Sequence, residues 1–271
     1  MIWRFLGRHL SGGRGDSAGH RDNPVPKVHR EPFSAPIHPD ETLAVIGDLH
    51  GCSTLFDRLL TRLEHEAPEA RRIAVGDLVD RGEDSRGVLE RVFQLSQDDP
   101  RFVTLLGNHE EMMLDFLDRP EEAGSRWLRY GGLQTCASFN VSGLRETSGP
   151  ADLRSGAEAL TEKLGPILPW LRALPLMFQS GNIAVVHAGA SPNRPLEHQQ
   201  RSALLWGHPQ FPTLDRADGR WIVHGHTIVP VVEAHRGRLG VDTGAYATGI
   251  LSAAVLTPDG TCKTVSVTSA G

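Results

Sequence analysis

The chain has 271 residues, enough for one large domain with a buried core. Its net charge is -5 and it contains no block of lysines and arginines, so the composition argues against a nucleic-acid-binding protein. The three cysteines are widely spaced and form no disulfide framework or CxxC zinc site, which fits a reducing compartment. No apolar run approaches the roughly 20 residues of a membrane span, and the first residues lack the pattern of a secretory leader. We therefore expect a cytoplasmic protein that contacts neither nucleic acid nor membrane.

The N-terminal stretch, residues 1–40, mixes Gly, Arg, His, Pro and Ser without hydrophobic periodicity. Five prolines oppose regular structure there, namely Pro24, Pro26, Pro32, Pro36 and Pro39. This composition predicts a disordered tail over residues 1–40, followed by a single folded domain over residues 41–271. A peptide that docks onto a partner is the alternative interpretation of the tail.

Three units of strand, loop and helix follow the tail. Each begins with a short apolar run that ends at a glycine-containing loop, and the runs are Thr42–Ile46, Arg72–Val75 and Phe102–Leu106. Apolar residues recur at helical spacing after each loop, with the third helix expected from Glu111 onward. Three such units in succession predict a mostly parallel sheet with helices on both of its faces.

The second half of the chain begins with a region that lacks strand signals. Residues 111–180 contain helical patterns interrupted by prolines, so we expect a helical insertion that caps the site. Strand signals resume at Asn182–Val186 and at Trp221–Val223. The last 40 or so residues alternate apolar and polar positions, which predicts antiparallel strands that form a second sheet.

Side chains suited to metal binding follow five of the predicted strands. They are Asp48, His50, Asp77, Asn108, His187 and His226. Oxygens and imidazoles without a thiolate suit Mn²⁺, Fe or Zn²⁺ in an open, catalytic site. Six ligands are too many for one catalytic ion with open positions, and they suit two ions that share a carboxylate. Such a pair can supply hydroxide at neutral pH and polarise a phosphoryl oxygen.

Three further residues in these loops suit phosphate chemistry. Arg81 offers a planar fork of donors for the oxygens of a phosphate. His109 adjoins Asn108 and can protonate a leaving oxygen, and Asp80 can hold and charge-stabilise that imidazole. Taken alone, the loop around Asp77 could be a salt-bridged surface turn. Four other loops of similar design favour a site.

The loop sequences resemble the signature motifs of the PPP family of metal-dependent phosphatases, in its bacterial and phage branch. The motifs lie between about residues 42 and 256 and are Gly47-Asp48-Leu49-His50-Gly51, Gly76-Asp77-Leu78-Val79-Asp80-Arg81-Gly82, Gly107-Asn108-His109-Glu110, His187-Ala188-Gly189 and Gly225-His226-Thr227. The resemblance implies an α/β fold of the calcineurin-like α-β-β-α type, with two mixed sheets, helices outside and a helical cap insertion. It also implies two divalent ions, most often Mn²⁺.

The resemblance assigns a role to each motif residue. It implies one ion on Asp48, His50 and Asp77, and a second ion on Asn108, His187 and His226, with Asp77 bridging the two. It implies His109 as the general acid, Asp80 as its partner, and Arg81 together with Asn108 at the substrate phosphate.

The chain departs from the family pattern at two positions. Where the family keeps a second phosphate-binding arginine, often in a Trp-Ile-Arg sequence, this chain has Trp206-Gly207-His208. His208 is therefore the candidate for that place, although imidazole binds phosphate less firmly than guanidinium at neutral pH. His224 lies two residues before His226 and is either an additional ligand or a core side chain.

Three functions are compatible with these motifs. The first is hydrolysis of phosphomonoesters, either phosphoserine and phosphothreonine in proteins or small phosphoesters. The second is hydrolysis of diadenosine tetraphosphate, the activity of a sister branch that tends to lack the second aspartate of Asp-x-x-Asp-Arg-Gly and to follow Asn-His with Asp. Asp80 and Glu110 favour the first. The third is a non-catalytic scaffold, which the intact ligand set argues against. The sequence indicates no oligomeric state.

Overall fold

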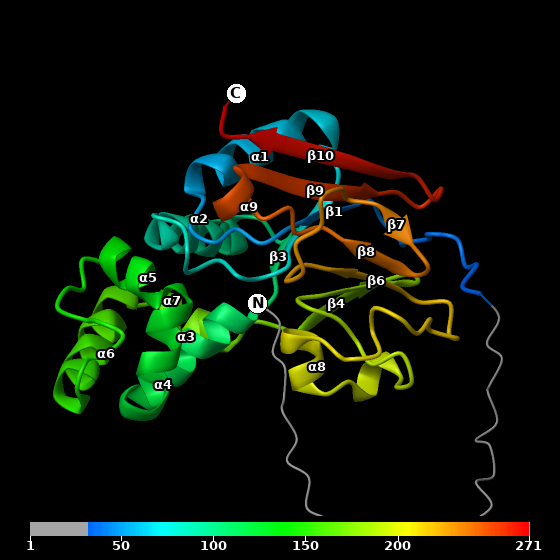
Figure 1. Cartoon of the computed structure of the whole chain (residues 1–271). Coiled ribbons are helices and arrows are strands. Elements are labelled where there is room, and N and C mark those ends of the chain that lie inside the picture. Colours follow the sequence, from blue (N-terminus) through cyan, green and yellow to red (C-terminus); the bar gives the residue numbers. More distant parts are fainter. Residues whose placement is uncertain (1–31, 271) are drawn as a thin grey trace, which may run out of the picture. The chain divides into compact units, whose positions relative to one another are not determined.

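The computed structural model describes residues 32–270. Within them the chain forms two five-stranded sheets (Figure 1). Most of the predicted tail, residues 1–31, lies outside the described residues. Phe33 and Ile37, however, pack in the core between the sheets, so the folded part begins before residue 41.

The first sheet has the strand order β10-β9-β1-β2-β3. Its parallel strands are the three predicted ones, β1 (Leu43–Ile46), β2 (Arg71–Ala74) and β3 (Phe102–Thr104). Its antiparallel strands are the C-terminal pair, β9 (Ile250–Leu256) and β10 (Cys262–Thr268). The expectation that the C-terminal strands form a second sheet is wrong for β9 and β10, although residues 234–240 of the same stretch do belong to the second sheet. Residues 251–256 are all buried, which suits an interior strand beside β1 better than a separate, half-solvated pair.

The second sheet has the order β4-β5-β6-β8-β7. Its parallel strands are β5 (Ile183–Val186), β6 (Trp221–His224) and β8 (Arg238–Gly240), and its antiparallel edges are β4 (Met177–Ser180) and β7 (Ala234–His235). The sequence analysis missed β4, which falls inside the region expected to be helical. It is a partly exposed edge strand and carries no continuous apolar run.

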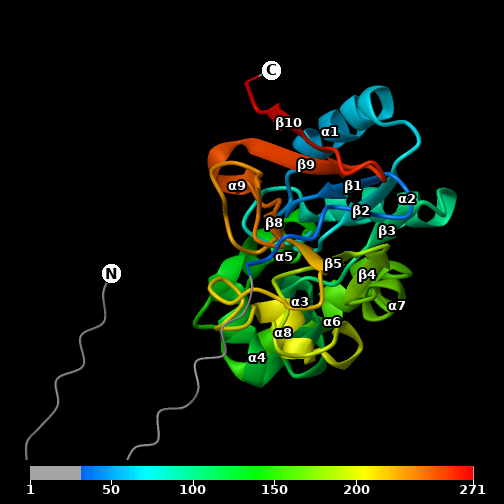
Figure 2. The ribbon, with the colours of Figure 1, turned by 90° about the vertical axis from the view of Figure 1, so that its right-hand side faces the viewer.

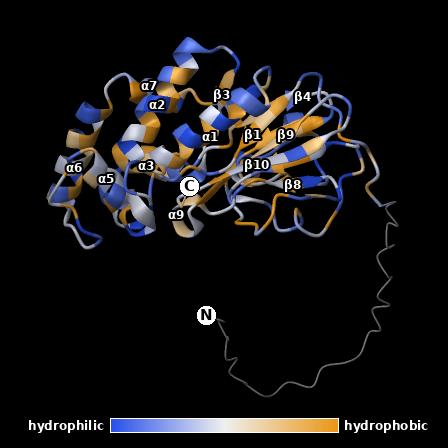
Figure 3. Cartoon of the chain, turned by 90° about the horizontal axis from the view of Figure 1, so that it is seen from above, coloured by the Kyte–Doolittle hydropathy of each residue, from blue (hydrophilic) through white to orange (hydrophobic). Residues whose placement is uncertain are grey.

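The two sheets pack face to face through alternate residues of their strands. Leu43 and Val45 of β1 belong to the same buried cluster as Val185 and Val223 of the second sheet. The intervening residues of β1 face helices instead. Each sheet therefore has helices on one face only, and the expectation of helices on both faces of one sheet is wrong. In Figure 3 the hydrophobic colour runs along β1 and β9, whereas the surrounding helices show both colours.

Helices cover the outer faces of the sheets. The helices of the first three units are α1 (Ser53–Glu66), α2 (Ser85–Asp98) and α3 (Asn108–Asp118). On the second sheet, a short helix α8 (Arg201–Trp206) packs Leu204 against Ala184 and Ile222 (Figure 2). A single 3₁₀ turn lies at Leu196–His198, and a short helix α9 (Ala245–Thr248) contacts β9 of the first sheet.

The region after α3 is largely helical and lies to one side of the sheets in Figure 1. It comprises α4 (Pro120–Trp127), a π-helical turn η1 (Leu128–Gly132), α5 (Leu133–Ser138), α6 (Pro150–Leu164) and α7 (Ile167–Arg172). We call residues 120–172 the helical insertion. The third helix starts at Asn108 rather than Glu111, because Gly107 caps it and the Glu110 carboxylate accepts the Gly107 N–H.

None of the helices within residues 32–270 combines the length and the apolar character that a membrane crossing requires.

Candidate metal centre and active site

The predicted site residues lie on loops and a helix start at the carboxyl ends of five strands. Three of these strands belong to the first sheet and two to the second. Asp48 and His50 follow β1, Asp77 follows β2, Asn108 opens α3 after β3, His187 follows β5, and His226 follows β6. Since parallel strands present their carboxyl ends at one edge, the face-to-face sheets bring all of these loops to a common edge.

The loop backbones are strongly turned. Five site residues other than glycine have positive φ, namely His50 (41°), Asp77 (51°), Asp80 (72°), Arg81 (68°) and His226 (62°). Such conformations cost on the order of 1–3 kcal/mol each and persist where the surrounding structure enforces them, often at functional sites. The backbone turns at His50, so the side chains of Asp48 and His50 do not alternate as they would on a strand.

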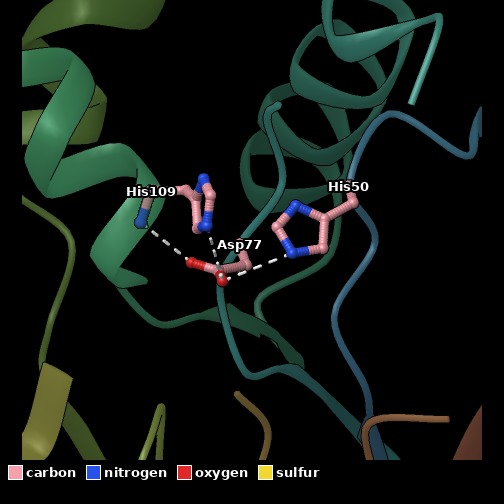
Figure 4. Close-up of side chains that lie close together, drawn as sticks. All are labelled: His50, Asp77 and His109. Atoms are coloured by element: carbon pink, nitrogen blue, oxygen red, sulfur yellow. Dashed lines mark hydrogen bonds and ion pairs between the residues drawn. The ribbon is translucent and has the colours of Figure 1, made fainter. Parts of the chain in front are cut away.

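Asp77 lies at the centre of two groups of possible ligands. One group is His50, Asp77 and His109, and the other is Asp77, His187 and His226. Asp77 Oδ2 lies 3.5 Å from His50 Nε2, and Asp77 Oδ1 lies 3.4 Å from His187 Nε2 (Figure 4 shows the first group). The two carboxylate oxygens thus face different groups, as a bridging ligand requires.

The remaining predicted ligands adjoin these groups. Asn108 Oδ1 lies 2.8 Å from both His187 Nε2 and His226 Nδ1. The Asp48 carboxylate accepts the backbone N–H of His226 at 3.0 Å and is buried, although it is not a member of either group. All six predicted ligands therefore converge on the same region.

The tautomers of His50 and His187 leave their Nε2 atoms as acceptors. His50 Nδ1 lies 2.8 Å from Val79 O and His187 Nδ1 lies 3.0 Å from Val75 O, and a carbonyl can only accept a hydrogen bond. Burial lowers the pKa of His50 to about 3 and the pKa of His187 to about 4, against the opposing effect of Asp77, so both rings are neutral at pH 7. Their Nε2 lone pairs face the Asp77 carboxylate.

The Nε2 lone pairs of His50 and His187 thus face the lone pairs of the Asp77 carboxylate, with no hydrogen between them. A cation placed between these atoms would accept electron pairs from both sides. Two ligands on one ion, with bonds of about 2.1 Å, lie about 3.0–3.4 Å apart, close to the spacing around Asp77. The donor set of carboxylate, amide oxygen and imidazole also fits a divalent ion. The second ring nitrogen of each histidine is held by a backbone carbonyl, as is usual for metal ligands.

Neighbouring carboxylates add to the unbalanced negative charge. Burial, together with Asp242 and Asp77, raises the pKa of Asp48 well above its ordinary value. Burial also raises the pKa of Asp242 to about 6, with Asp77 contributing. Buried carboxylates that resist ionisation beside one another are stabilised by a bound cation.

Glu110 supports the two central loops rather than facing the ligand groups. Its Oε2 accepts the backbone N–H groups of Asp77 and Gly107 at 2.8 and 2.9 Å. Its Oε1 accepts those of Leu78 and Val79 at 2.7 and 3.2 Å. One fully buried carboxylate therefore joins the loop after β2 to the start of α3.

His109 is held between Asp80 and Arg81. Its Nδ1 lies 2.6 Å from Asp80 Oδ2, and its Nε2 lies 3.1 Å from a terminal nitrogen of Arg81. Burial lowers the pKa of His109, but Asp77 and Asp80 outweigh it and the net pKa is raised. Arg81 also donates to the hydroxyl of Tyr246 at 3.0 Å, with its guanidinium carbon 4.8 Å from the centre of that ring.

The histidines at the two departures from the family pattern, His208 and His224, lie in different surroundings. His208 accepts the backbone N–H of Gln210 at 3.2 Å within its own loop, and its role at the phosphate stays a prediction. His224 is buried edge-to-face against Phe211, with ring centres 5.0 Å apart, and its Nδ1 lies 3.0 Å from Gly225 O. Burial lowers the pKa of His224 to about 4, so it behaves as a core side chain.

Sequence reasoning passed over two polar side chains of this site. Trp127 Nε1 and Thr135 Oγ1 both donate to the Asp80 carboxylate. Neither residue belongs to a signature motif, and both residue types are common in protein cores. The Gly131-Gly132 pair between them, which is typical of a loop, is the one local signal that could have pointed to them.

Residues 41–230 match the calcineurin-like phosphoesterase family. Among curated proteins, a symmetrical bis(5'-nucleosyl)-tetraphosphatase of Janthinobacterium sp. is 31% identical over 153 residues, which are 56% of this chain and 44% of that protein. Serine/threonine-protein phosphatase 2 of Salmonella typhimurium is 26% identical over 220 residues, 77% of this chain and 89% of that protein. Serine/threonine-protein phosphatase 1 of the same organism is 34% identical over 88 residues, 32% of this chain and 38% of that protein. The chain thus spans about half or less of the length of several curated relatives.

Solved structures share the fold at low sequence identity. A protein serine/threonine phosphatase from Saccharomyces cerevisiae has a TM-score of 0.55 at 18% identity, over 88% of this chain and 84% of that one. A cold-active protein-tyrosine phosphatase of a psychrophilic Shewanella has a TM-score of 0.54 at 17% identity, over 92% and 88%. With the family match over most of the described domain, and with the α-β-β-α arrangement and the convergent ligands, the chain belongs to the calcineurin-like phosphoesterases, a family of metal-dependent hydrolases.

Proposed function

We propose that the chain hydrolyses phosphomonoesters, either phosphoserine and phosphothreonine in proteins or small phosphoesters. The observation that carries the proposal is the placement of His109, held by Asp80 at 2.6 Å and contacting Arg81, beside Asp77 within the first group of possible ligands. This placement supports roles for His109 as proton donor and for Arg81 as phosphate-binding cation, beside candidate metal ligands at one edge of the sheets.

Two divalent ions fit the ligand set, with Mn²⁺ favoured and Fe or Zn²⁺ also suited. Asp48, His50 and Asp77 would hold one ion. The second would be held by Asp77 together with Asn108, His187 and His226. When bound, such a pair lowers the pKa of water and polarises a phosphoryl oxygen.

The protein's own groups bind the phosphate and handle the proton. Arg81 and Asn108 bind the non-bridging oxygens, and Tyr246 keeps the Arg81 guanidinium in place. His109, protonated on both ring nitrogens, gives its Nε2 proton to the ester oxygen as the bond from phosphorus to that oxygen breaks. The oxygen of a water molecule joins the phosphorus as the alcohol leaves. One proton of that water stays on the phosphate, and the other returns through solvent to His109. Asp80 stabilises the imidazolium, and the raised pKa of His109 favours that form.

Hydrolysis of dinucleoside tetraphosphates is the second candidate, because several relatives carry that name. The same ligands and the same arginine would serve it. Asp80 and Glu110 support the phosphomonoesterase, because the tetraphosphatase branch tends to lack the first residue and to have aspartate in place of the second.

A paired assay with added Mn²⁺ separates the candidates. We expect hydrolysis of p-nitrophenyl phosphate and of a phosphoserine peptide, with a much lower kcat/KM for ADP release from diadenosine tetraphosphate. Dominant ADP release would favour the second candidate. No turnover of any of the three would favour a non-catalytic scaffold. Asp77→Asn provides the inactive control, because it removes the charge shared by both ligand groups.

A further inference from the structure

The Asp80 carboxylate is completely buried beneath the helical insertion. Besides His109, two side chains of the insertion donate hydrogen bonds to it. Thr135 Oγ1 donates to Oδ1 at 2.6 Å, and Trp127 Nε1 lies 3.0 Å from Oδ2 and 3.2 Å from Oδ1. A buried carboxylate is stable only with such donors, and here two of the three come from outside the signature motifs.

Thr135 also fixes the backbone of Asp80. The Asp80 N–H donates to Thr135 Oγ1 at 2.9 Å and to Ser85 Oγ at 3.0 Å. Asp80 has a φ of 72°, a conformation that needs support from its surroundings. One hydroxyl therefore orients both the main chain and the carboxylate of Asp80.

The turn between Trp127 and Thr135 lies directly against the Arg81 loop. Gly131 has a φ of 116°, and a Cβ added there would lie 2.6 Å from the Arg81 nitrogen. A Cβ on Gly132 would lie 2.5 Å from the Trp127 ring. Trp127 in turn stacks on Phe116 of α3, the helix that carries His109, with ring centres 4.8 Å apart. The two glycines thus allow the insertion to approach the loop closely enough for both donors to reach Asp80.

We propose that Trp127 and Thr135 are positioning residues for acid catalysis. They hold the Asp80 carboxylate in the orientation that keeps His109 Nδ1 turned toward Asp80 and leaves Nε2 for the phosphoester. The helical insertion then contributes to proton donation, because two of its side chains orient the Asp80–His109 pair. The inference rests on the proposed function, because it concerns the proton given to a leaving oxygen.

The test uses isosteric variants of the metal-loaded chain. Trp127→Phe removes the indole N–H and Thr135→Val removes the hydroxyl. Each is expected to lower kcat about 10-fold for phenyl phosphate, whose leaving group needs a proton, with KM little changed. The loss with p-nitrophenyl phosphate is expected to stay below about 3-fold, because that leaving group needs little protonation. Thr135→Ser, which keeps the hydroxyl, should retain most of the wild-type kcat.

Matched substitutions separate positioning from general damage. Trp170→Phe makes the same change elsewhere in the insertion, and Thr104→Val makes it at a buried threonine whose hydroxyl has no partner within the described residues. Neither substitution should change the ratio of kcat for phenyl phosphate to kcat for p-nitrophenyl phosphate. In an Asp80→Asn background, Trp127→Phe and Thr135→Val should cause no further leaving-group-dependent loss, because residues that act through one group are not additive.

A second measurement does not depend on turnover. In proton NMR spectra of the metal-free chain, the His109 Nδ1 proton should give a downfield signal that persists in Thr104→Val and is lost or broadened in Thr135→Val and Trp127→Phe. The inference would be overturned if Trp127→Phe and Thr135→Val lowered kcat equally for both substrates. It would also be overturned if their effects on kcat multiplied with that of Asp80→Asn. An inactive wild type would end the proposed function alone, and the NMR signal would then decide the positioning.

Discussion

The carboxylate of Glu110 accepts the backbone N–H of Asp77 at 2.8 Å. A residue of α3 thereby fixes the loop that carries the central carboxylate of the site. The same side chain accepts three more backbone N–H groups, from Gly107, Leu78 and Val79. The geometry around Asp77 therefore depends on a neighbour that is itself a member of neither ligand group.

Replacing Glu110 by glutamine should destabilise the site and the fold. In the variant, the amide nitrogen of glutamine would face two backbone N–H groups that a carboxylate oxygen accepts in the wild type. Leaving buried donors unpaired costs about 1–3 kcal/mol each, so we expect the free energy of unfolding to fall by at least about 2 kcal/mol. Urea denaturation measures this. Glu111→Gln, on the same helix but paired with Arg201 and Trp206, is the control for metal affinity, which only Glu110→Gln should weaken.

Replacing His109 by asparagine should remove the general acid while both ions remain. A general acid contributes a factor on the order of 10²–10⁴, so kcat should fall by that amount for phenyl phosphate. The loss should shrink for p-nitrophenyl phosphate. His65→Asn, at the end of α1, should leave both rates unchanged. An equal loss on the two substrates would remove His109 from the acid role.

Tyr246→Phe should weaken phosphate binding with little effect on kcat. The change removes the hydroxyl that accepts from Arg81 and keeps the ring beneath the guanidinium. Because the tyrosine is 38% exposed, we expect KM to rise by about 3- to 10-fold, somewhat less than a buried hydrogen bond to a charged group contributes. Tyr130→Phe, at the chain's other tyrosine, is the control. An unchanged KM in Tyr246→Phe would show that Arg81 holds its place without the hydroxyl.

Asp215 ties the segment after α8 to the β7–β8 hairpin through Arg236 at 2.9 Å and Arg238 at 3.0 Å. Burial raises the pKa of Asp215, but the two arginines outweigh it and the net pKa is lowered. A carboxyl whose pKa is lower in the folded than in the unfolded state stabilises the fold above the unfolded pKa, and this contribution is lost as pH falls through the folded pKa.

Asp215→Asn should therefore lower the free energy of unfolding at pH 7 by about 2 kcal/mol, the scale of hydrogen bonds to a charged group. The difference from wild type should shrink as the pH falls below about 4. Asp57→Asn, at an exposed pair with Arg91, should change little at either pH. A difference that stays constant with pH would show that the ion pairs do not carry the effect.

The sequence predicted the strands that carry the site because each is a short apolar run followed by a glycine-containing loop. β1, β2, β3, β5 and β6 were all placed within about two residues of their bounds. Their loops hold the predicted ligands, and Asp77 belongs to both groups of possible ligands, although His109 and not Asp48 is the third member of the first group.

The wrong predictions concern which strands pair with one another and which strands lie at the edge of a sheet. A local sequence pattern does not determine either. β9 was expected in a second sheet and instead lies beside β1, because strand order depends on contacts between residues about 200 positions apart. β4 was missed because an edge strand lacks a buried, continuous apolar run. Trp127 and Thr135 were missed because their partner, Asp80, is about 50 residues away and their residue types are common in cores.

Metal content measured together with activity tests the central claim most directly. We expect about two ions per wild-type chain, loss of activity with EDTA and recovery with Mn²⁺. Asp77→Asn should retain less than one ion and negligible activity, whereas Asp80→Asn should retain both ions with reduced kcat. A fully active wild type that holds a single ion, or an Asp77→Asn variant that keeps two ions and full activity, would contradict the dinuclear centre bridged by Asp77.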